Sequence, residues 1–320
     1  MEKRTVALLL ARGPFTNSFR AQADLKYKAL LPINDIPMVD YVLHALQQSV
    51  SEKIFIVQGV DEGLETAVRS HHKNVFINCS ADGSSFSSSL FSGLAKLAEN
   101  YSQDELSRTD IMLVPCDIPL VSSSNFDRLI AENSLKGSDV CVSMIHAGRL
   151  KEKYPGRDFR GIYYHDLGYL YCIQNFAFIS GDTLNWAYHG GTRKNYDSRY
   201  VLPDNIMRDV IATADYFVAS REKRCQILLI LWEYLRRLIT RGYIRESLLS
   251  LSKLLNKRYT TVDGRRFLFL ASGLMGDYIE SEEAELSFDV DKPEHLEAVL
   301  KFKSCNYVAR EADDRTAVRY

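Results

Sequence analysis

The sequence is poor in the residues that build special-purpose chains. Its 320 residues include only 17 glycines and 8 prolines, which excludes a collagen-like chain and leaves little room for long flexible linkers. Its six cysteines are scattered and form no Cys-x-x-Cys pair, so the sequence argues against a disulfide scaffold and against a zinc site. With 40 Lys plus Arg against 41 Asp plus Glu, the net charge is −1, and no overall positive field predicts binding of nucleic acid.

Long hydrophobic runs are missing as well. The apolar run at residues 6–11 is too short for the core of a secretory signal. The longest later run, at residues 225–232, falls far below the roughly 20 residues that span a membrane. The remaining composition, 46% hydrophobic and 25% charged, is typical of globular proteins. We therefore expect a soluble, cytoplasmic protein without a transmembrane segment.

Apolar runs alternate with amphipathic segments over the first half of the chain. Strands are predicted at residues 5–10, 53–57, 75–79, 111–114 and 139–145, and helices at residues 37–48, 61–70, 89–97 and 125–132. The apolar run 28–33 is interpreted as a further strand, followed by a turn at Asn34 and Asp35. This alternation predicts βαβ units in a mostly parallel sheet, whose ligands bind at the carboxyl ends of the strands.

The second half of the chain is less regular. We predict a strand at 170–179, a helix at 202–212, a strand at 267–270 and a terminal helix with Pro293 in its first turn. Residues 221–258 form a basic helical segment, which we interpret as an insertion that packs on the core or at a homodimer interface; a membrane-surface helix is the alternative. The predicted division is a core at 1–220 and 260–303, the insertion at 221–258 and a tail at 304–320.

Four charged residues lie where they could carry chemistry. Lys28 lies between a loop that contains glycine and an apolar run, where a cation can balance nucleotide phosphates; a solvated surface lysine is the alternative. Asp117 directly follows a buried strand, a position suited to holding Mg²⁺, although a turn or N-cap aspartate has the same local pattern. Asp289 and Asp291 precede a Pro-Glu helix start, and either one could supply a second carboxylate or cap the helix.

Five segments follow one another along the chain: VALLLARG at 6–13, KALLPINDIPM at 28–38, SSSLFSGL at 87–94, VPCDIPL at 114–120 and DVDKPEHL at 289–296. Their order resembles that of the MobA-like nucleotidyltransferases. This family includes molybdopterin guanylyl- and cytidylyltransferases and related enzymes that act on sugar phosphates and alcohol phosphates. The resemblance implies a three-layer α/β/α, Rossmann-like (GT-A-like) fold with a mostly parallel central sheet and a helical insertion.

The same resemblance implies a reaction and a set of site residues. A phosphorylated acceptor (a sugar phosphate, an alcohol phosphate or a molybdopterin-like molecule) would attack the α-phosphate of a nucleoside triphosphate and release pyrophosphate. Lys28 is similar to the signature lysine that stabilises charge on the triphosphate, and Asp117 and Asp291 are similar to the two carboxylates that hold Mg²⁺. The residues implied in nucleotide binding are Leu10, Ala11, Arg12 and Gly13 in the phosphate loop, and Ser88 and Ser89 near the base and ribose.

The phosphate loop departs from the family pattern at Arg12, which stands where the family carries a glycine. Glycine serves there because the backbone must approach phosphate closely. Arg12 either clamps a phosphate or blocks the site. The first alternative function is therefore a nucleotide-binding regulator or scaffold with impaired catalysis. The second is a nucleotide-sugar glycosyltransferase, whose Asp-x-Asp motif has the form of residues 289–291.

A basic cluster offers a candidate for the acceptor side. Lys151, Lys153, Arg157 and Arg160 surround a Tyr-Pro-Gly segment. The cluster could hold an acceptor phosphate, but we favour the interpretation that it is a solvated basic loop.

Overall fold

The computed structural model describes part of the chain in detail. The described residues are 3–11, 27–49, 53–58, 62–72, 76–79, 86–189 except 135, 158 and 160, and then 248–249, 252–253, 256–265 and 274–303. The helix predicted at 202–212, the strand predicted at 267–270 and most of the basic segment 221–258 lie outside these residues. The division into core, insertion and tail therefore stays a prediction.

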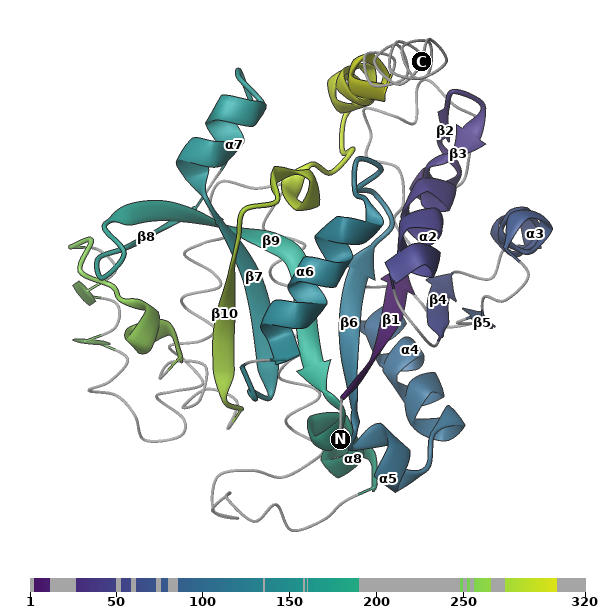
Figure 1. The fold of residues 1–320 in the computed structure, drawn as a ribbon, viewed down its shortest axis with the longest axis horizontal. Helices are drawn as coiled ribbons and strands as arrows, with labels where there is room; N and C mark the ends of the chain where they lie inside the picture. Colours follow the sequence, from purple (N-terminus) through teal and green to yellow (C-terminus); the bar gives the residue numbers. More distant parts are fainter. Residues whose placement is uncertain are drawn as a thin grey trace, which may run out of the picture.

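A central sheet organises the described chain (Figure 1). Its eight strands are β1 (Arg4–Leu10), β4 (Ile54–Gln58), β5 (Phe76–Cys79), β6 (Thr109–Pro115), β7 (Val140–His146), β8 (Ile162–Tyr164), β9 (Tyr169–Ser180) and β10 (Gly276–Ser281). The strand order is β10-β7-β9-β6-β1-β4-β5, and β8 pairs with β9. β9 is antiparallel to both β6 and β7, whereas β6, β1, β4 and β5 are parallel neighbours and β10 is parallel to β7. The predicted mostly parallel sheet is confirmed.

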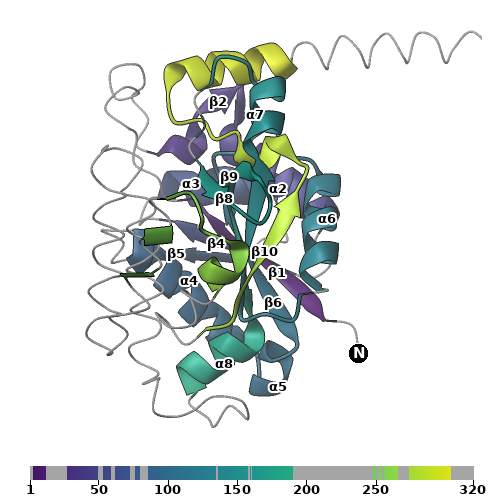
Figure 2. The same cartoon turned by 90° about the vertical axis from the view of Figure 1, so that its left-hand side faces the viewer.

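Helices cover both faces of this sheet. Those described are α2 (Met38–Ser49), α3 (Glu62–His71), α4 (Phe86–Asn100), α5 (Gln103–Leu106), α6 (Ser123–Ser134), α7 (Ala147–Lys153), α8 (Gly181–His189), a helical turn over residues 261–265 and a helix over residues 293–303. Figure 2 shows α2 and α6 on one side of the strands and α4 on the other. Alternate residues of β1 explain the two layers, because Leu9 packs in the cluster that contains α2 and α6 while Leu8 packs in the cluster that contains α4. The predicted three-layer arrangement is confirmed.

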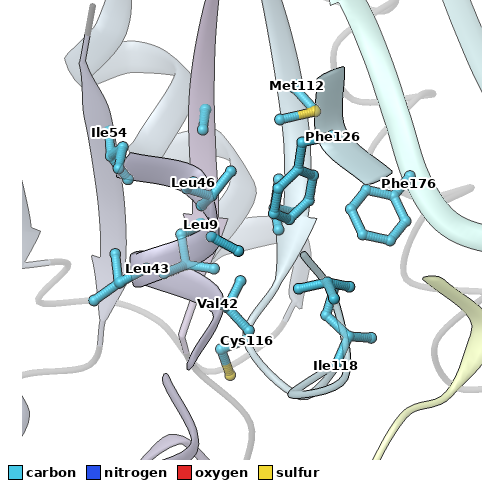
Figure 3. Close-up of a cluster of buried hydrophobic side chains, with 14 of the residues drawn as sticks. Leu9, Val42, Leu43, Leu46, Ile54, Met112, Cys116, Ile118, Phe126 and Phe176 are labelled. Atoms are coloured by element: carbon cyan, nitrogen blue, oxygen red, sulfur yellow. The ribbon is translucent and has the colours of Figure 1, made fainter. Parts of the chain in front are cut away.

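The larger apolar cluster lies beneath the carboxyl end of β6. Cys116 and Ile118, the two neighbours of Asp117, are buried in it together with Val42 and Phe126 (Figure 3). Full burial of an isoleucine, valine or phenylalanine side chain stabilises the fold by about 1.5–3 kcal/mol. The backbone on both sides of Asp117 is therefore anchored in the core, which fixes where its carboxylate lies.

The chain between the first strand and α2 differs from its prediction. Residues 28–33 do not form one strand: Lys28–Leu30 is a 3-10 turn (η1), and only Pro32–Ile33 (β2) pairs, with Ile36–Pro37 (β3), in a small separate hairpin. The prediction of a strand is wrong because these apolar residues do not pair within the central sheet: Ala29 and Leu30 pack in the larger core cluster, and Leu31 and Ile33 pack in a third cluster. The predicted turn is confirmed, since Asn34 and Asp35 have φ values of 50° and 64°, which these residue types tolerate.

The parallel strands bring remote segments together at one edge. The register Leu10↔Pro115 places the carboxyl ends of β1 and β6 side by side, and the loops that follow them start at the same edge. The 3-10 turn η2 (Ala284–Ser287) and the helix over 293–303 lie at this edge, after β10 (Figure 1). Among the described residues, no helix combines the length and apolar character that crossing a membrane requires.

Candidate active site

Lys28 is the centre of a charged cluster at this edge. Its Nζ donates to Asp117 Oδ2 at 2.6 Å and to Asp291 Oδ1 at 2.5 Å. The side chain of Lys28 is only 7% exposed. Burial by itself would lower the pKa of this lysine, but the two carboxylates outweigh burial and the net shift of its pKa is upward. The lysine is therefore a fixed positive charge, and the surface-lysine alternative does not describe it.

Backbone contacts join the two acidic segments. The Val290 N–H donates to the carbonyl oxygen of Asp117 at 2.9 Å, although the two residues come from opposite halves of the chain. Phe288 and Val290 are buried in the third apolar cluster, which holds the segment in place. The Asp291 N–H donates to His295 Nδ1 at 3.2 Å. Burial, helped by the nearby Arg157, lowers the pKa of His295, which keeps the ring neutral and able to accept this bond.

Three carboxylates converge in a geometry that suits a cation. Ligand atoms of Asp117, Asp289 and Asp291 lie within 4.8 Å of one another. Lys28 occupies one oxygen of Asp117, and the other, Oδ1, is buried and has no hydrogen-bond partner among the described residues. A buried carboxylate oxygen without a partner is costly unless a cation or water satisfies it. Oxygen-only donors are those that Mg²⁺ prefers, so these residues fit such an ion.

Arg157 is the second cation in contact with the three carboxylates. Its Nη2 donates to Asp289 Oδ1 at 2.5 Å and to the carbonyl oxygen of Asp289 at 3.1 Å. The guanidinium carbon lies 4.3 Å from the centroid of the Phe288 ring. Three carboxylates thus face two protein cations, Lys28 and Arg157, so the cluster has one net negative charge.

Two members of the predicted basic cluster, Lys153 and Arg157, pair with acidic residues, whereas Lys151 is exposed and Arg160 lies outside the described residues. Lys153, in the last turn of α7, forms an ion pair with Glu285, and Arg149 forms one with Glu282 at 2.6 Å. These side chains face the acidic turn η2, and Arg157 faces Asp289. These ion pairs hold α7 and the residues after it against the segment that carries Asp289 and Asp291.

The predicted nucleotide-binding residues are described only in part. Leu10 ends β1 at the site edge, and Ala11, which follows it, is fully buried. Arg12 and Gly13 lie outside the described residues. Ser88 and Ser89 lie in the first turn of α4, which begins at Phe86 instead of at the predicted Ser89. Backbone N–H groups in the first turn of a helix have no intrahelical partners, a property that suits anions.

Cys116 is adjacent to Asp117 but chemically inert. Burial, reinforced by the charge of Asp117, raises the pKa of the Cys116 thiol to about 12. A protonated, buried thiol is neither a nucleophile nor a ligand at neutral pH. Its neighbour Asp117 is therefore the group at the end of β6 that can carry chemistry.

Gln174, which sequence reasoning did not single out, ties the sheet to the acidic segment. It is buried on β9, accepts from Ser143, and donates to the Glu283 carbonyl oxygen at 2.8 Å and to Ser287 Oγ at 3.0 Å. A lone glutamine in a strand carries no local signal of such a role.

Replacing Gln174 by leucine is expected to lower the free energy of unfolding by about 1–3 kcal/mol, because buried polar partners lose their hydrogen bonds. Urea denaturation at pH 7 measures the change. Gln48, an exposed glutamine on α2, is the matched control, and Gln48→Leu should stay within about 0.5 kcal/mol of the parent. Equal effects of the two substitutions would contradict the role given to Gln174.

A known structure shares this fold, and two others are less similar. A structure described as a hypothetical transferase from Thermus thermophilus has a TM-score of 0.59 and 18% identity, over 92% of this chain and 99% of that chain. A CMP:2-keto-3-deoxy-manno-octonic acid synthetase in complex with CTP has a TM-score of 0.49 and 12% identity, over 95% and 99%. A 4-diphosphocytidyl-2C-methyl-D-erythritol synthase from Anaerococcus prevotii has a TM-score of 0.47 and 11% identity, over 94% and 99%.

Comparison at the level of sequence gives the family. No curated protein matches the sequence significantly. A family model described as the MobA-like NTP transferase domain matches residues 9–250, which is most of the chain. The predicted resemblance is confirmed, and the protein belongs to the MobA-like NTP transferase family.

Proposed function

We propose that the protein is a Mg²⁺-dependent nucleotidyltransferase that moves a nucleoside monophosphate from a nucleoside triphosphate to a phosphorylated acceptor. The observation that carries this proposal is the contact of one buried lysine, Lys28, with both Asp117 and Asp291 at the carboxyl edge of the sheet. A parallel sheet presents its ligand-binding residues at this edge. Family membership supports the same class of reaction.

In the proposed reaction, an oxygen of the acceptor phosphate forms a bond to the α-phosphorus of the nucleotide. The bond from the α-phosphorus to the bridging oxygen of the β-phosphate breaks, and pyrophosphate leaves with that electron pair. Such transfers need positioning and charge stabilisation instead of a protein nucleophile. The inert thiol of Cys116 is consistent with this requirement.

The charges of the site fit a triphosphate. Asp117 and Asp291 would hold Mg²⁺, which neutralises charge on the phosphates when bound. An ammonium group has three N–H donors, and Lys28 uses two of them on the carboxylates. We assign the third donor to a phosphate oxygen, so that Lys28 stabilises charge as pyrophosphate departs. The segment 10–13 and the first turn of α4, with Ser88 and Ser89, would contact the phosphates and the nucleoside.

Release of pyrophosphate tests this function. The four nucleoside triphosphates are each incubated with Mg²⁺ and with phosphorylated sugars, phosphorylated alcohols or molybdopterin. We expect release of pyrophosphate that needs one nucleotide, one acceptor and the divalent cation together. Mg²⁺-dependent nucleotide binding with no release for any acceptor would instead favour a binding protein with impaired catalysis. Transfer of sugar from a nucleotide sugar would favour the glycosyltransferase alternative.

A further inference from the structure

The ammonium group of Lys28 is held inside the acidic cluster. Its Nζ lies 2.6 Å from Asp117 Oδ2 and 2.5 Å from Asp291 Oδ1. The backbone of the residue is fixed too, because the Leu31 N–H donates to the Lys28 carbonyl oxygen at 3.1 Å and the neighbouring Ala29 is fully buried. Lys28 is therefore anchored at both ends, and its charge stays beside the carboxylates.

This charge affects how strongly the cluster attracts a further cation. Ligand atoms of the three carboxylates lie within 4.8 Å of one another, so a cation held by any of them would be a near neighbour of the ammonium group. With Lys28 and Arg157 the cluster has one net negative charge, and without Lys28 it would have two. Repulsion between an ammonium group and a divalent ion at such range exceeds thermal energy even with the screening of water. Lys28 therefore weakens the attraction for Mg²⁺, whichever of the carboxylates bind it.

A triphosphate changes this balance. Its oxygens are ligands for Mg²⁺ and acceptors for an ammonium group, so it adds attraction for the cation at the same edge of the sheet. We propose that Lys28 keeps the affinity of the acidic cluster for Mg²⁺ low until a nucleoside triphosphate binds, so that the cation enters together with the nucleotide. This inference rests on the proposed function, which supplies both the nucleotide and the cation.

The test measures Mg²⁺ affinity calorimetrically on the full chain without nucleotide. Lys28→Met removes the ammonium group and should bind Mg²⁺ at least about tenfold more tightly than the parent. Mg²⁺ should also raise the melting temperature of Lys28→Met by more than that of the parent, because an ion that binds the folded state stabilises it more when it binds more tightly. Equal or lower affinity in folded Lys28→Met would overturn the proposal, since a lysine with a purely structural role would not suppress cation binding.

Three further variants complete the test. Lys28→Gln covers the case in which Lys28→Met does not fold, because glutamine is neutral but still donates hydrogen bonds, and it should show the same gain. Lys28→Arg keeps the charge and should bind Mg²⁺ as weakly as the parent; a tenfold gain in this variant would overturn the proposal. Lys3→Met is the matched control, because Lys3 pairs with Asp110 near the other end of β6, and its affinity should stay within about twofold of the parent.

Asp117→Asn separates this inference from the function on which it rests. If Asp117→Asn leaves the Mg²⁺ affinity of the Lys28→Met protein unchanged, the cation site of the proposed transferase is wrong. If Asp117→Asn weakens that affinity while Lys28→Met and the parent bind Mg²⁺ equally, only the role of Lys28 in suppressing cation binding is wrong.

Discussion

Replacing Lys28 by methionine is expected to lower kcat/KM for nucleotidyl transfer by about 10²–10³-fold, the usual cost of losing one pre-positioned charge-stabilising group. Methionine keeps an unbranched, apolar side chain as far as Cε but removes the ammonium group with its three N–H donors. Both carboxylates that Lys28 contacts then lose their nearest cation. Steady-state release of pyrophosphate at saturating Mg²⁺ measures the effect.

The same substitution should lower stability. Breaking a buried ion pair costs about 3–5 kcal/mol, and the expected loss is at the low end because Asp291 is 31% exposed. The pKa of Lys28 is raised, so its contribution to stability is complete at neutral pH and is lost only as the pH rises through that raised pKa. The difference in unfolding free energy between parent and variant should therefore be constant from neutral to mildly alkaline pH.

Two further variants check that the effect belongs to the site. Lys96 is an exposed lysine on α4 that pairs with Glu99, and Lys96→Met should leave activity within about twofold of the parent. Lys28→Arg keeps the positive charge and should recover part of the stability. Parent-like activity in folded Lys28→Met would contradict the role given to Lys28.

Replacing Asp117 by asparagine is expected to lower kcat/KM by at least about 10²-fold and to weaken Mg²⁺ binding, because a neutral amide oxygen holds a divalent cation poorly. The fold should survive, since asparagine still offers an acceptor to Lys28 and the neighbouring Cys116 and Ile118 stay buried. Calorimetric titration with Mg²⁺, followed by the pyrophosphate assay, measures both effects.

Asp127→Asn is the matched control for this substitution. Asp127 lies on α6 and accepts from Ser49 Oγ at 2.6 Å, away from the acidic cluster. Its replacement should leave both Mg²⁺ affinity and activity within about twofold of the parent. If Asp117→Asn behaves like Asp127→Asn, the carboxylate at the end of β6 does not hold the cation.

The sequence predicted the parts of the site that depend on a single strand. The apolar run before Asp117 is β6, and parallel pairing with β1 was the expected consequence of alternating strands and helices. Proline at residue 293 correctly indicated the start of the terminal helix. These features depend on local patterns of a few residues, which can be recognised from the sequence alone.

Contacts between remote segments were less predictable. Nothing near Arg157 indicates that it pairs with an aspartate 132 residues later, and its basic neighbours favoured a solvated loop. Lys28 was expected beside a strand, but it begins the 3-10 turn η1, whose Ala29 and Leu30 pack in the larger core cluster. The edge strand β10 was missed because its sequence, GDYIES, mixes polar and apolar residues on a half-exposed edge. Tertiary packing decided each of these cases.

The most direct test of the proposed site is diffraction from crystals grown with Mn²⁺ and a nucleoside triphosphate analogue that cannot be cleaved at the α–β bridge. Anomalous scattering locates the manganese independently of any assumption about its ligands. We expect a peak bonded to carboxylate oxygens of Asp117 and Asp291 and to a phosphate oxygen, with Lys28 in contact with the triphosphate. A nucleotide and metal bound elsewhere, or a metal held by Asp289 with Arg157 displaced, would contradict this expectation.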